Sequence, residues 1–137
     1  MGDCIFCKIV KGEIPAVKVY EDESVLAFMD INPINDGHTL VIPKKHAENI
    51  FEIEAKDLLA VMEVAHKIAR AIKESLKPEA LTVVQLNGRL AGQMVPHLHV
   101  HLIPRREGDA LKVSWEMIPG DMEKIKAAAE KIKGALR

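Results

Sequence analysis

The spacing of apolar residues along the chain predicts five strands and two helices. Short runs rich in aliphatic residues, each bounded by glycine, proline or acidic turn residues, are typical of strands. From 55 to 77, apolar residues recur every three or four positions, which predicts one long amphipathic helix that ends before Pro78. A similar pattern predicts a closing helix over 121–136. The predicted strands cover residues 17–20, 25–29, 38–42, 82–86 and 97–103.

The last of these strands, 97–103, alternates histidine with leucine or valine, which is the period of a half-buried strand. Its apolar side chains would pack inward, and His97, His99 and His101 would stand on the other face, about 6.6 Å apart in succession. Since the outer pair would lie about 13 Å apart, one metal ion could take two neighbouring imidazoles but hardly all three. The pattern therefore leaves at least one histidine for other chemistry. The alternatives are a simple metal-binding strand or a polar surface strand.

Composition limits the class of protein. A chain of 137 residues with 48% hydrophobic content predicts one domain with a substantial core. The net charge of -1 gives no general attraction to nucleic acid or to an anionic membrane. No apolar run approaches the roughly 18 residues that a membrane helix needs, and no signal peptide is visible. We therefore expect a cytoplasmic protein with no membrane and no nucleic-acid partner.

Both cysteines of the chain lie in the motif Cys4-Ile5-Phe6-Cys7. In a cytosolic protein this spacing indicates either a redox pair or half of a metal site. The redox interpretation calls for a strand before the motif, and no strand is predicted there. A disulfide is disfavoured in a reducing compartment. A zinc ion would need two further ligands, for which the histidines are the available candidates.

The chain resembles the histidine triad (HIT) family. Segment 97–103 is similar to the family's signature, and five upstream segments agree with the family in order and spacing. The resemblance covers residues 4–104, about three quarters of the chain, and is closest to small nucleotide-binding hydrolases such as phosphoramidases. It leaves out the C-terminal helix region, 119–137. The upstream segments are residues 5–10, 13–15, 27–33, 37–44 and 91–93.

The resemblance implies a fold and an assembly. We expect a single α+β domain of the HIT-like fold spanning residues 1–137, built on an antiparallel sheet of about five strands with one long helix and a C-terminal helix. Family members of this kind form two-fold homodimers in which the sheet is extended. The resemblance implies the same homodimer here.

The resemblance also implies hydrolysis of a nucleotide at its α-phosphorus. His99 would be the nucleophile, giving a nucleotidyl-histidine that water hydrolyses; a neutral imidazole is competent for this near pH 7. His101 and His38 would hold or protonate phosphate oxygens, and Gln93 with its backbone would bind the α-phosphate. The expected activity is that of a purine nucleoside phosphoramidase. The alternatives are a dinucleoside polyphosphate (Ap4A-type) hydrolase and a non-catalytic nucleotide-binding or sensing protein.

Further positions of the family motif imply how the nucleotide would be held. Asp30 would accept hydrogen bonds from the ribose hydroxyls, Asn87 would lie at the phosphate or ribose edge, and apolar residues would wall the base pocket. Apolar walls with few polar anchors suit a purine loosely, so we expect broad tolerance of the base. The implied nucleotide-binding residues are Phe6, Ile9, Phe28, Asp30, Ile31, Leu40, Asn87, Gly92, Gln93, His99 and His101.

Some family members carry a zinc ion held by an N-terminal C-x-x-C motif, the histidine after Pro-Lys and the first triad histidine. In this chain those positions are Cys4, Cys7, His46 and His97. Four protein ligands leave no open position, so the resemblance implies one structural zinc per chain. The ion would lie near the nucleophile and would fix the segment that aims it.

One position departs from the family pattern. The residue after the glutamine is often Ser, Thr or Glu, but here it is Met94, which can neither donate a proton nor carry charge. We therefore expect phosphate binding to be kept and the protonation of an amine leaving group to be weakened.

Overall fold

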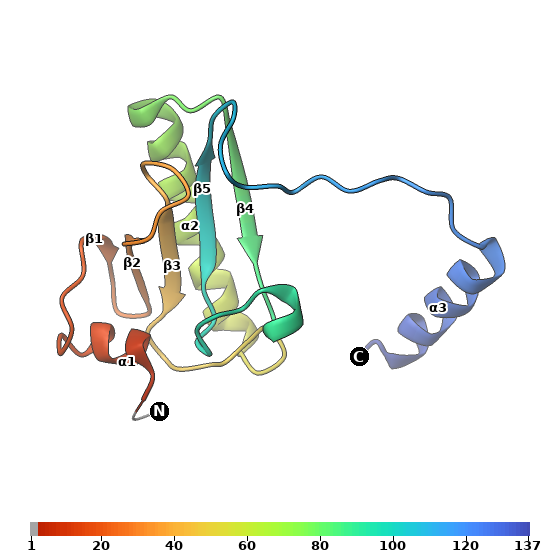
Figure 1. Cartoon of the computed structure of the whole chain (residues 1–137). Coiled ribbons are helices and arrows are strands. Elements are labelled where there is room, and N and C mark those ends of the chain that lie inside the picture. The colour runs from red at the N-terminus through yellow and green to blue at the C-terminus, as the bar shows by residue number, and fades with distance from the viewer. Residues whose placement is uncertain (1–2) are drawn as a thin grey trace.

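The chain folds around one antiparallel sheet of five strands in the order β1-β2-β3-β5-β4 (Figure 1). This computed structural model describes residues 3–137. Each pair of neighbouring strands runs antiparallel, so the predicted α+β class and the predicted sheet are confirmed. The strands are β1 (Lys18–Glu21), β2 (Val25–Met29), β3 (Thr39–Pro43), β4 (Ala80–Gln85) and β5 (Val100–Arg105).

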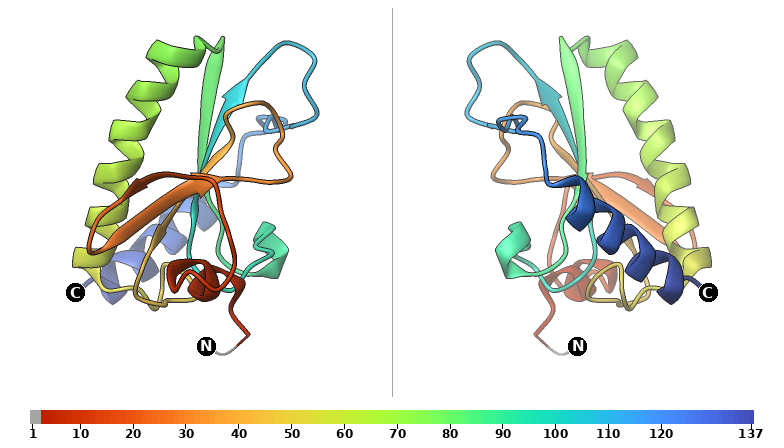
Figure 2. Two further views of the ribbon diagram at one scale, coloured as in Figure 1. Left: turned by 90° about the vertical axis from the view of Figure 1, so that its left-hand side faces the viewer. Right: turned by 90° about the vertical axis from the view of Figure 1, so that its right-hand side faces the viewer.

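Helices lie on both sides of the sheet. The long helix α2 (Ala55–Leu76) covers one face, whereas α1 (Ile5–Val10) and the short 3-10 helix η1 (Arg89–Ala91) lie on the other side (Figure 2). Because side chains alternate along a strand, β2 and β3 each contribute to two buried clusters, whereas β5 contributes to the one under α2. The cluster under α2 contains Val25, Ala27, Val41, Val61, Val64, Ala65, Ile72, Val100 and Leu102. The cluster under α1 contains Cys4, Phe6, Cys7, Ile9, Leu26, Phe28, Leu40 and Ile42.

The long helix matches its prediction to within one residue. It ends at Leu76, and Lys77 takes a left-handed conformation with φ of 51°. This ending follows from Pro78, because a residue before proline is disfavoured from continuing a helix. Within residues 3–137, no helix combines the length and the apolar content needed to cross a membrane.

The histidine segment is a strand only in its second half. β5 begins at Val100, so His97 and His99 lie in the bend that leads into the strand, and only His101 belongs to it. The bend arises because the Leu98 N–H donates to the carbonyl of Ala47, 2.8 Å away, in a loop outside the sheet. The predicted start of this strand at residue 97 is therefore wrong.

The prediction of a half-buried segment is also wrong, because α1 covers the histidine face. His97 and His99 are 0% and 6% exposed, while Leu98 on the opposite side is also fully buried. The alternation itself is confirmed, since apolar side chains point to the α2 face and the histidines to the α1 face. His97 and His99 are thus interior residues, and His101 is half-buried.

Helix α1 was not predicted. Its six residues are too few to show a helical period in the sequence. Cys4 begins it, and its sulfur accepts a hydrogen bond from the Cys7 N–H at 3.3 Å. One cysteine therefore caps the turn that carries the other.

After β5 the chain leaves the sheet as an extended segment that ends in helix α3 (Met122–Ala135), which stands apart from the sheet (Figure 1). The predicted closing helix is confirmed, but it does not pack on the domain. Every residue from 112 to 137 is exposed. We call residues 107–137 the C-terminal arm.

Candidate functional site

Four metal-binding atoms converge where α1 meets the bend before β5. They are the Sγ atoms of Cys4 and Cys7 and the Nδ1 atoms of His46 and His97, and all lie within 4.8 Å of one another. The cysteines come from the start of α1, His46 follows β3, and His97 precedes β5. The structure thus brings together the four residues that were expected to hold a metal.

The distances between these atoms fit a tetrahedral ion. Zinc bonds of about 2.3 Å to sulfur and about 2.0–2.1 Å to nitrogen give tetrahedral edges of about 3.6 Å (S···N) and about 3.3 Å (N···N). His97 Nδ1 lies 3.3 Å from Cys4 Sγ, 3.6 Å from Cys7 Sγ and 3.2 Å from His46 Nδ1. Cys7 Sγ lies 3.3 Å from His46 Nδ1. The residues therefore fit a four-coordinate site with no open position.

The protonation of His97 also suits a metal ligand. Its Nε2–H donates to the Pro43 carbonyl at 2.8 Å, which leaves the lone pair of the neutral ring on Nδ1, facing the other donors. Burial lowers the pKa of His97 to about 4, so the ring is neutral near pH 7. Burial also raises the pKa of the Cys7 thiol, and a bound cation would favour the thiolate and release that proton.

His99, the middle histidine, has its free lone pair on Nε2, whereas His97 has it on Nδ1. The Nδ1–H of His99 donates to the carbonyl of His97 at 2.7 Å, so the lone pair of the neutral ring lies on Nε2. Burial lowers the pKa of His99, which keeps the ring neutral at pH 7. A neutral imidazole with an unprotonated Nε2 is the form that can attack an electrophilic phosphorus atom.

His38 and His101 form a hydrogen-bonded pair beside this nitrogen. The N–H of Ile34 donates to His38 Nδ1 at 3.1 Å, so the neutral ring of His38 carries its proton on Nε2. That proton points to Nδ1 of His101, 3.0 Å away. His101 in turn carries its proton on Nε2, and its ring lies against His99 with centroids 4.8 Å apart. The pair is therefore arranged to pass a proton toward the reacting centre.

Asp30, His38 and His101 also lie close enough to form a three-ligand metal site. The hydrogen bonds oppose that use. Because the N–H of Ile34 engages His38 Nδ1, the Nε2 atom of His38 holds a proton and has no lone pair for a cation. This cluster suits proton transfer, whereas the cysteine-containing cluster suits a metal.

Burial keeps the proton-transfer pair neutral in the free protein. It lowers the pKa of His101 to about 4, with His99 and His38 acting in the same direction. Burial also lowers the pKa of His38, and the Asp30 carboxylate, 3.5 Å from His38 Nε2, opposes that shift. A bound anion would favour the protonated pair, so the site is suited to a ligand that brings negative charge.

An apolar wall stands next to the nucleophile candidate. The Phe6 ring meets the His99 ring edge-on, with centroids 5.1 Å apart, and meets the Phe28 ring at 5.4 Å. Ile9 and Leu40 belong to the same buried cluster. The four residues expected to line a base pocket are therefore assembled on one side of the triad, packed tightly against each other.

Two polar residues expected at the nucleotide are engaged elsewhere in this structure. The Gln93 side chain accepts from the Gly88 N–H at 2.8 Å and donates to the Glu48 carbonyl at 2.7 Å. Asn87 accepts from the Ile50 N–H at 2.7 Å and pairs with the side chain of Gln85. Both side chains brace the loop around η1.

The remaining expected positions lie in the loops that border the site. Ile31 is 84% exposed and Met94 is 89% exposed, so neither packs into the domain. Gly92 has φ of 100°, a left-handed conformation that favours glycine at the end of η1. A side chain at that position would strain the turn that leads to Gln93.

Sequence analysis missed three backbone groups that decide the chemistry of the site. The carbonyls of Pro43 and His97 and the N–H of Ile34 each set the proton position of one histidine. Backbone groups leave no residue pattern of their own. The turn residues that surround Ile34 predict a loop, but they do not predict that its Ile34 N–H points at His38.

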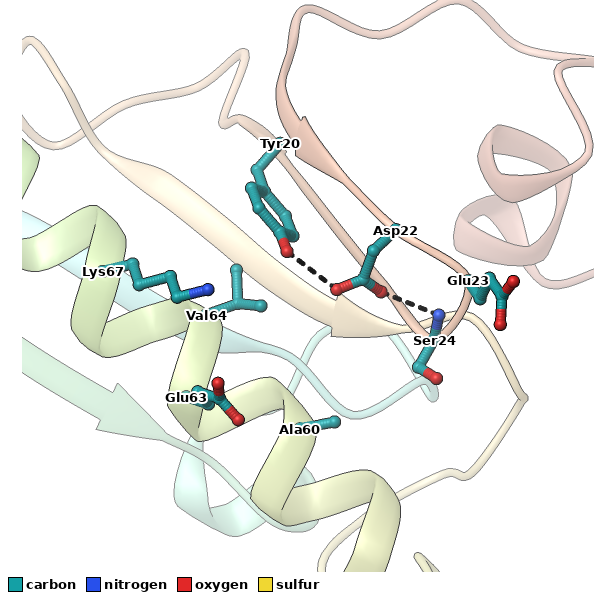
Figure 3. Close-up of a pocket in the computed structure, with 8 residues that line it drawn as sticks. All are labelled: Tyr20, Asp22, Glu23, Ser24, Ala60, Glu63, Val64 and Lys67. Atoms are coloured by element: carbon teal, nitrogen blue, oxygen red, sulfur yellow. Dashed lines mark hydrogen bonds between the residues drawn. The ribbon is translucent and has the colours of Figure 1, made fainter.

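A separate cavity of about 340 Å³ lies between α2 and the turn that joins β1 to β2 (Figure 3). One of the three carboxylates that line it, Asp22, accepts from the Tyr20 hydroxyl at 2.9 Å and from the Ser24 N–H at 2.8 Å. Because these partners lie two residues before and two residues after Asp22, this side chain stabilises its own turn. This cavity lies on the face of the sheet opposite the histidines.

Comparison with known proteins identifies relatives over nearly the whole chain. The sequence model of the HIT domain matches residues 11–108. The adenosine 5'-monophosphoramidase hnt1 of Schizosaccharomyces pombe is 44% identical over 135 residues, covering 98% of each chain. A zinc-bound histidine triad family protein from Mycobacterium smegmatis is 37% identical, with a TM-score of 0.75 over 98% of this chain and 99% of that one.

A HIT family protein from Bacillus anthracis is 43% identical and superposes with a TM-score of 0.93 over 98% of both chains. The C-terminal arm makes up 31 of the 137 residues. An arm placed elsewhere in that relative would hold the score well below 0.93. The extended arm therefore occupies the same position in the two structures.

Proposed function

This chain belongs to the HIT domain family, and we propose that it is a nucleotide hydrolase that acts at the α-phosphorus of its substrate through a nucleotidyl-histidine intermediate. The observation that carries this proposal is the hydrogen bond from His99 Nδ1–H to the His97 carbonyl at 2.7 Å. It leaves a lone pair on Nε2 of a neutral, buried imidazole. A protein that only bound nucleotides would not need that arrangement.

The first step forms one bond and breaks one. His99 Nε2 attacks the α-phosphorus, and the bond from phosphorus to the leaving group breaks, with its electron pair going to the leaving group. The His38–His101 pair takes up one proton together with the anionic substrate and gives it to a leaving amine. Donors around the phosphate stabilise the charge that develops on its oxygens.

The second step returns the enzyme to its starting state. Water attacks the phosphorus, the bond to Nε2 breaks, and a nucleoside monophosphate is released. A proton of the attacking water passes to the His38–His101 pair and replaces the one given away in the first step. When the product leaves, the pair releases this proton and is neutral again. Dividing one displacement into two lets the same imidazole serve as nucleophile and as leaving group.

We favour purine nucleoside phosphoramidates as substrates. Support comes from the relative named adenosine 5'-monophosphoramidase, which matches the chain over 98% of its length. Phe6, Ile9, Phe28 and Leu40 form an apolar wall beside His99, and Asp30 is the carboxylate expected to take the ribose hydroxyls. Gly92 and Gln93 would bind the α-phosphate. For this, the Gln93 side chain or its backbone N–H turns toward the phosphate when the substrate binds.

Dinucleoside polyphosphate hydrolysis is the second candidate, and Met94 favours it. A thioether cannot protonate a leaving group, and a polyphosphate leaving group needs no such proton. The two substrate classes share the same attack by His99, so only their relative rates separate them.

We further propose that Cys4, Cys7, His46 and His97 hold one structural zinc ion. The interatomic distances fit a tetrahedron, and one relative is a zinc-bound histidine triad protein. The ion would tie α1 to the bend that carries His99 and would take no part in bond breaking. Thiolate ligands of this kind persist in a reducing compartment, which agrees with the expected cytoplasmic location.

We also propose a homodimer formed along β4. This strand is an edge of the sheet, and its Val83 is 46% exposed. Ala69 of α2 lies beside β4, and Met62, seven residues earlier on the same helix face, is 42% exposed. An unpaired edge strand flanked by apolar side chains is a surface that a second copy would cover.

Trapping the intermediate tests the proposed mechanism. Protein is mixed with an AMP-amide labelled at phosphorus and quenched within one turnover in denaturant at alkaline pH, since a phosphorus–histidine bond is labile in acid. We expect labelled protein from the wild type and from the control His66→Ala, but none from His99→Ala. Hydrolysis without any labelled protein would overturn the covalent mechanism. Tight nucleotide binding without hydrolysis would indicate a binding protein.

A further inference from the structure

The loop between β2 and β3, residues 30–38, carries the backbone group that fixes the proton of His38. The Ile34 N–H donates to His38 Nδ1 at 3.1 Å, so the neutral ring keeps its proton on Nε2. That proton points to Nδ1 of His101, 3.0 Å away. If the Ile34 N–H turned away, His38 could carry its proton on either nitrogen. The orientation of one peptide unit therefore sets the direction of the hydrogen bond between the two rings.

That direction decides what His101 presents to a phosphate. While His101 Nδ1 accepts from His38, its own proton stays on Nε2, and the neutral ring can donate to an anionic oxygen. With the hydrogen bond reversed, the proton of His101 would lie on Nδ1 and a lone pair on Nε2. A lone pair repels an anion, so the reversed ring must first take a proton from solvent.

An anchor for this loop lies at the end of β5. Because β3 and β5 run antiparallel, the start of β3 and the end of β5 meet at the same end of the sheet (Figure 1). Asn35, the residue after Ile34, uses both hydrogens of its amide there: Nδ2 donates to the Pro104 carbonyl and to the Asp109 carboxylate, each at 2.8 Å. The Asn35 carbonyl also accepts from the His38 N–H at 3.1 Å. Asn35 therefore ties the loop to β5 and closes the turn that leads to His38.

The carboxylate that receives Asn35 is itself held in place. The Arg105 guanidinium donates to both oxygens of Asp109 at 2.7 Å, and the Asp109 side chain is only 4% exposed. Arg105 also donates to Thr82 Oγ1 of β4 at 3.0 Å and to the Leu111 carbonyl at 2.7 Å. Its hydrogen bonds hold the pKa of Asp109 well below the usual range, so the carboxylate is ionised near pH 7. Hydrogen bonds to a charged group are short and strong, which makes this end of the sheet a firm support.

Gly37 brings the same loop against its support at a second point. Its φ is 94°, a conformation that favours glycine. A Cβ atom at this position would come within 3.1 Å of Pro104 and would displace Leu76 at the end of α2. The loop is therefore held at two positions between Ile34 and His38.

We propose that Asn35 is a positioning residue for the reaction: its amide, fixed by Asp109 and the Pro104 carbonyl, orients the peptide N–H that keeps the proton of His38 on Nε2. Through His101, this directs an N–H at the phosphate. Asn35 acts through the backbone and is not itself a catalytic residue. The inference rests on the proposed function, because it concerns the same histidines.

The side-chain ¹⁵N spectrum of His38 tests the first half of the proposal, since it distinguishes a ring nitrogen that carries a proton from one that carries a lone pair. We expect the proton on Nε2 in the full-length wild type and a mixture of both forms in Asn35→Ala. Asn32→Ala replaces an exposed asparagine of the same loop and should match the wild type. A wild-type ring with its proton on Nδ1 overturns the proposal, and so does an unchanged ring in Asn35→Ala.

Hydrolysis of the p-nitrophenyl ester of AMP tests the second half, because its leaving group needs no proton. Loss of one donor to a developing oxyanion costs about 10²–10³-fold, and a partly reversed pair should lower kcat/KM at least about tenfold in Asn35→Ala. The deficit should grow from neutral to alkaline pH, since reversed rings need a proton from solvent. The titratable groups that face His101 are His38, His99 and Asp30, which all variants keep.

Asn32→Ala should stay within about twofold of the wild type at every pH. An unchanged rate in Asn35→Ala, or a deficit of equal size at every pH, would mean that Asn35 only stabilises its loop, and either result overturns the proposal. A wild type that does not hydrolyse the ester overturns the proposed function instead. The ¹⁵N spectra then decide alone whether Asn35 sets the proton of His38.

Discussion

The Nδ1–H of His99 donates to the backbone carbonyl of His97, 2.7 Å away. The side chain of His97 meanwhile points its own Nδ1 at Cys4, Cys7 and His46. A single residue therefore connects the proposed metal site to the proposed nucleophile, through its side chain on one side and its carbonyl on the other. A change that moves the backbone at His97 would alter both the proposed metal ligand and the hydrogen bond that sets the proton on His99.

We predict about one zinc ion per chain in protein purified without chelators. Cys4→Ser should lose the metal and lower the free energy of unfolding by about 4 kcal/mol, the effect of a ligand at a thousand times its dissociation constant. Elemental analysis and urea denaturation measure the two effects, with His66→Ala as the control for an exposed substitution. Wild-type protein that contains no metal would contradict this prediction.

Replacing the proposed nucleophile should separate binding from turnover. His99→Ala should lower kcat by several powers of ten, because loss of a covalent nucleophile removes the reaction path. Nucleotide affinity, measured by calorimetry, should stay within a few-fold, since the apolar wall and Asp30 are unchanged. Residual activity above about one per cent of the wild type would place the nucleophile elsewhere.

Met94 should make the rate depend steeply on the leaving group. A positioned acid contributes about 10²–10⁴-fold to a reaction whose leaving group needs a proton, and Met94 cannot supply one. We expect alkylamine AMP-amides to react slowly relative to p-nitrophenyl esters, and Met94→Ser to speed the amides selectively. Equal acceleration of both classes, or of neither, would show that protonation does not depend on this position.

Acid should destabilise the fold through His101. Burial lowers its pKa to about 4 in the folded chain from the ordinary 6.5. Between these values the unfolded chain binds more protons, so stability falls as pH falls through this window. His101→Gln should reduce the slope of unfolding free energy against pH by up to about 1.4 kcal/mol per unit, measured by urea denaturation. An unchanged slope in His101→Gln would refute the prediction.

Much of this fold follows from sequence patterns that extend over many residues. The period of α2 and its ending before Pro78 predicted its limits to within one residue, and the five strands were recognised from short aliphatic runs. Helix α1 was missed because six residues do not show a period. The bend at His97 was missed because it depends on a hydrogen bond from the Leu98 N–H to the carbonyl of Ala47, a loop residue far away in sequence.

Only part of the candidate site could be predicted from the sequence. Cys4 and Cys7 indicate a redox pair or half of a metal site, and the alternation of His97, His99 and His101 carries the family resemblance that implies phosphate chemistry, because both patterns are local to one short segment. Which nitrogen of each ring carries the proton depends on backbone partners such as Ile34 N–H, which have no signature in the sequence. The exposure of the arm also could not be predicted, since an amphipathic pattern indicates that a face is covered but not which molecule covers it.

The position of α1 has a consequence for how the protein is made. Cys4 meets His97 across 93 positions of sequence, so Cys4 leaves the ribosome long before His97 is made. Contacts of such long range form late, because the loop that they close is costly in entropy. A nascent chain that ends before His97 therefore carries the two thiols without this ligand and has no triad. The triad and the proposed metal site are complete only when β5 lies between β3 and β4 and α1 packs against His97 and His99.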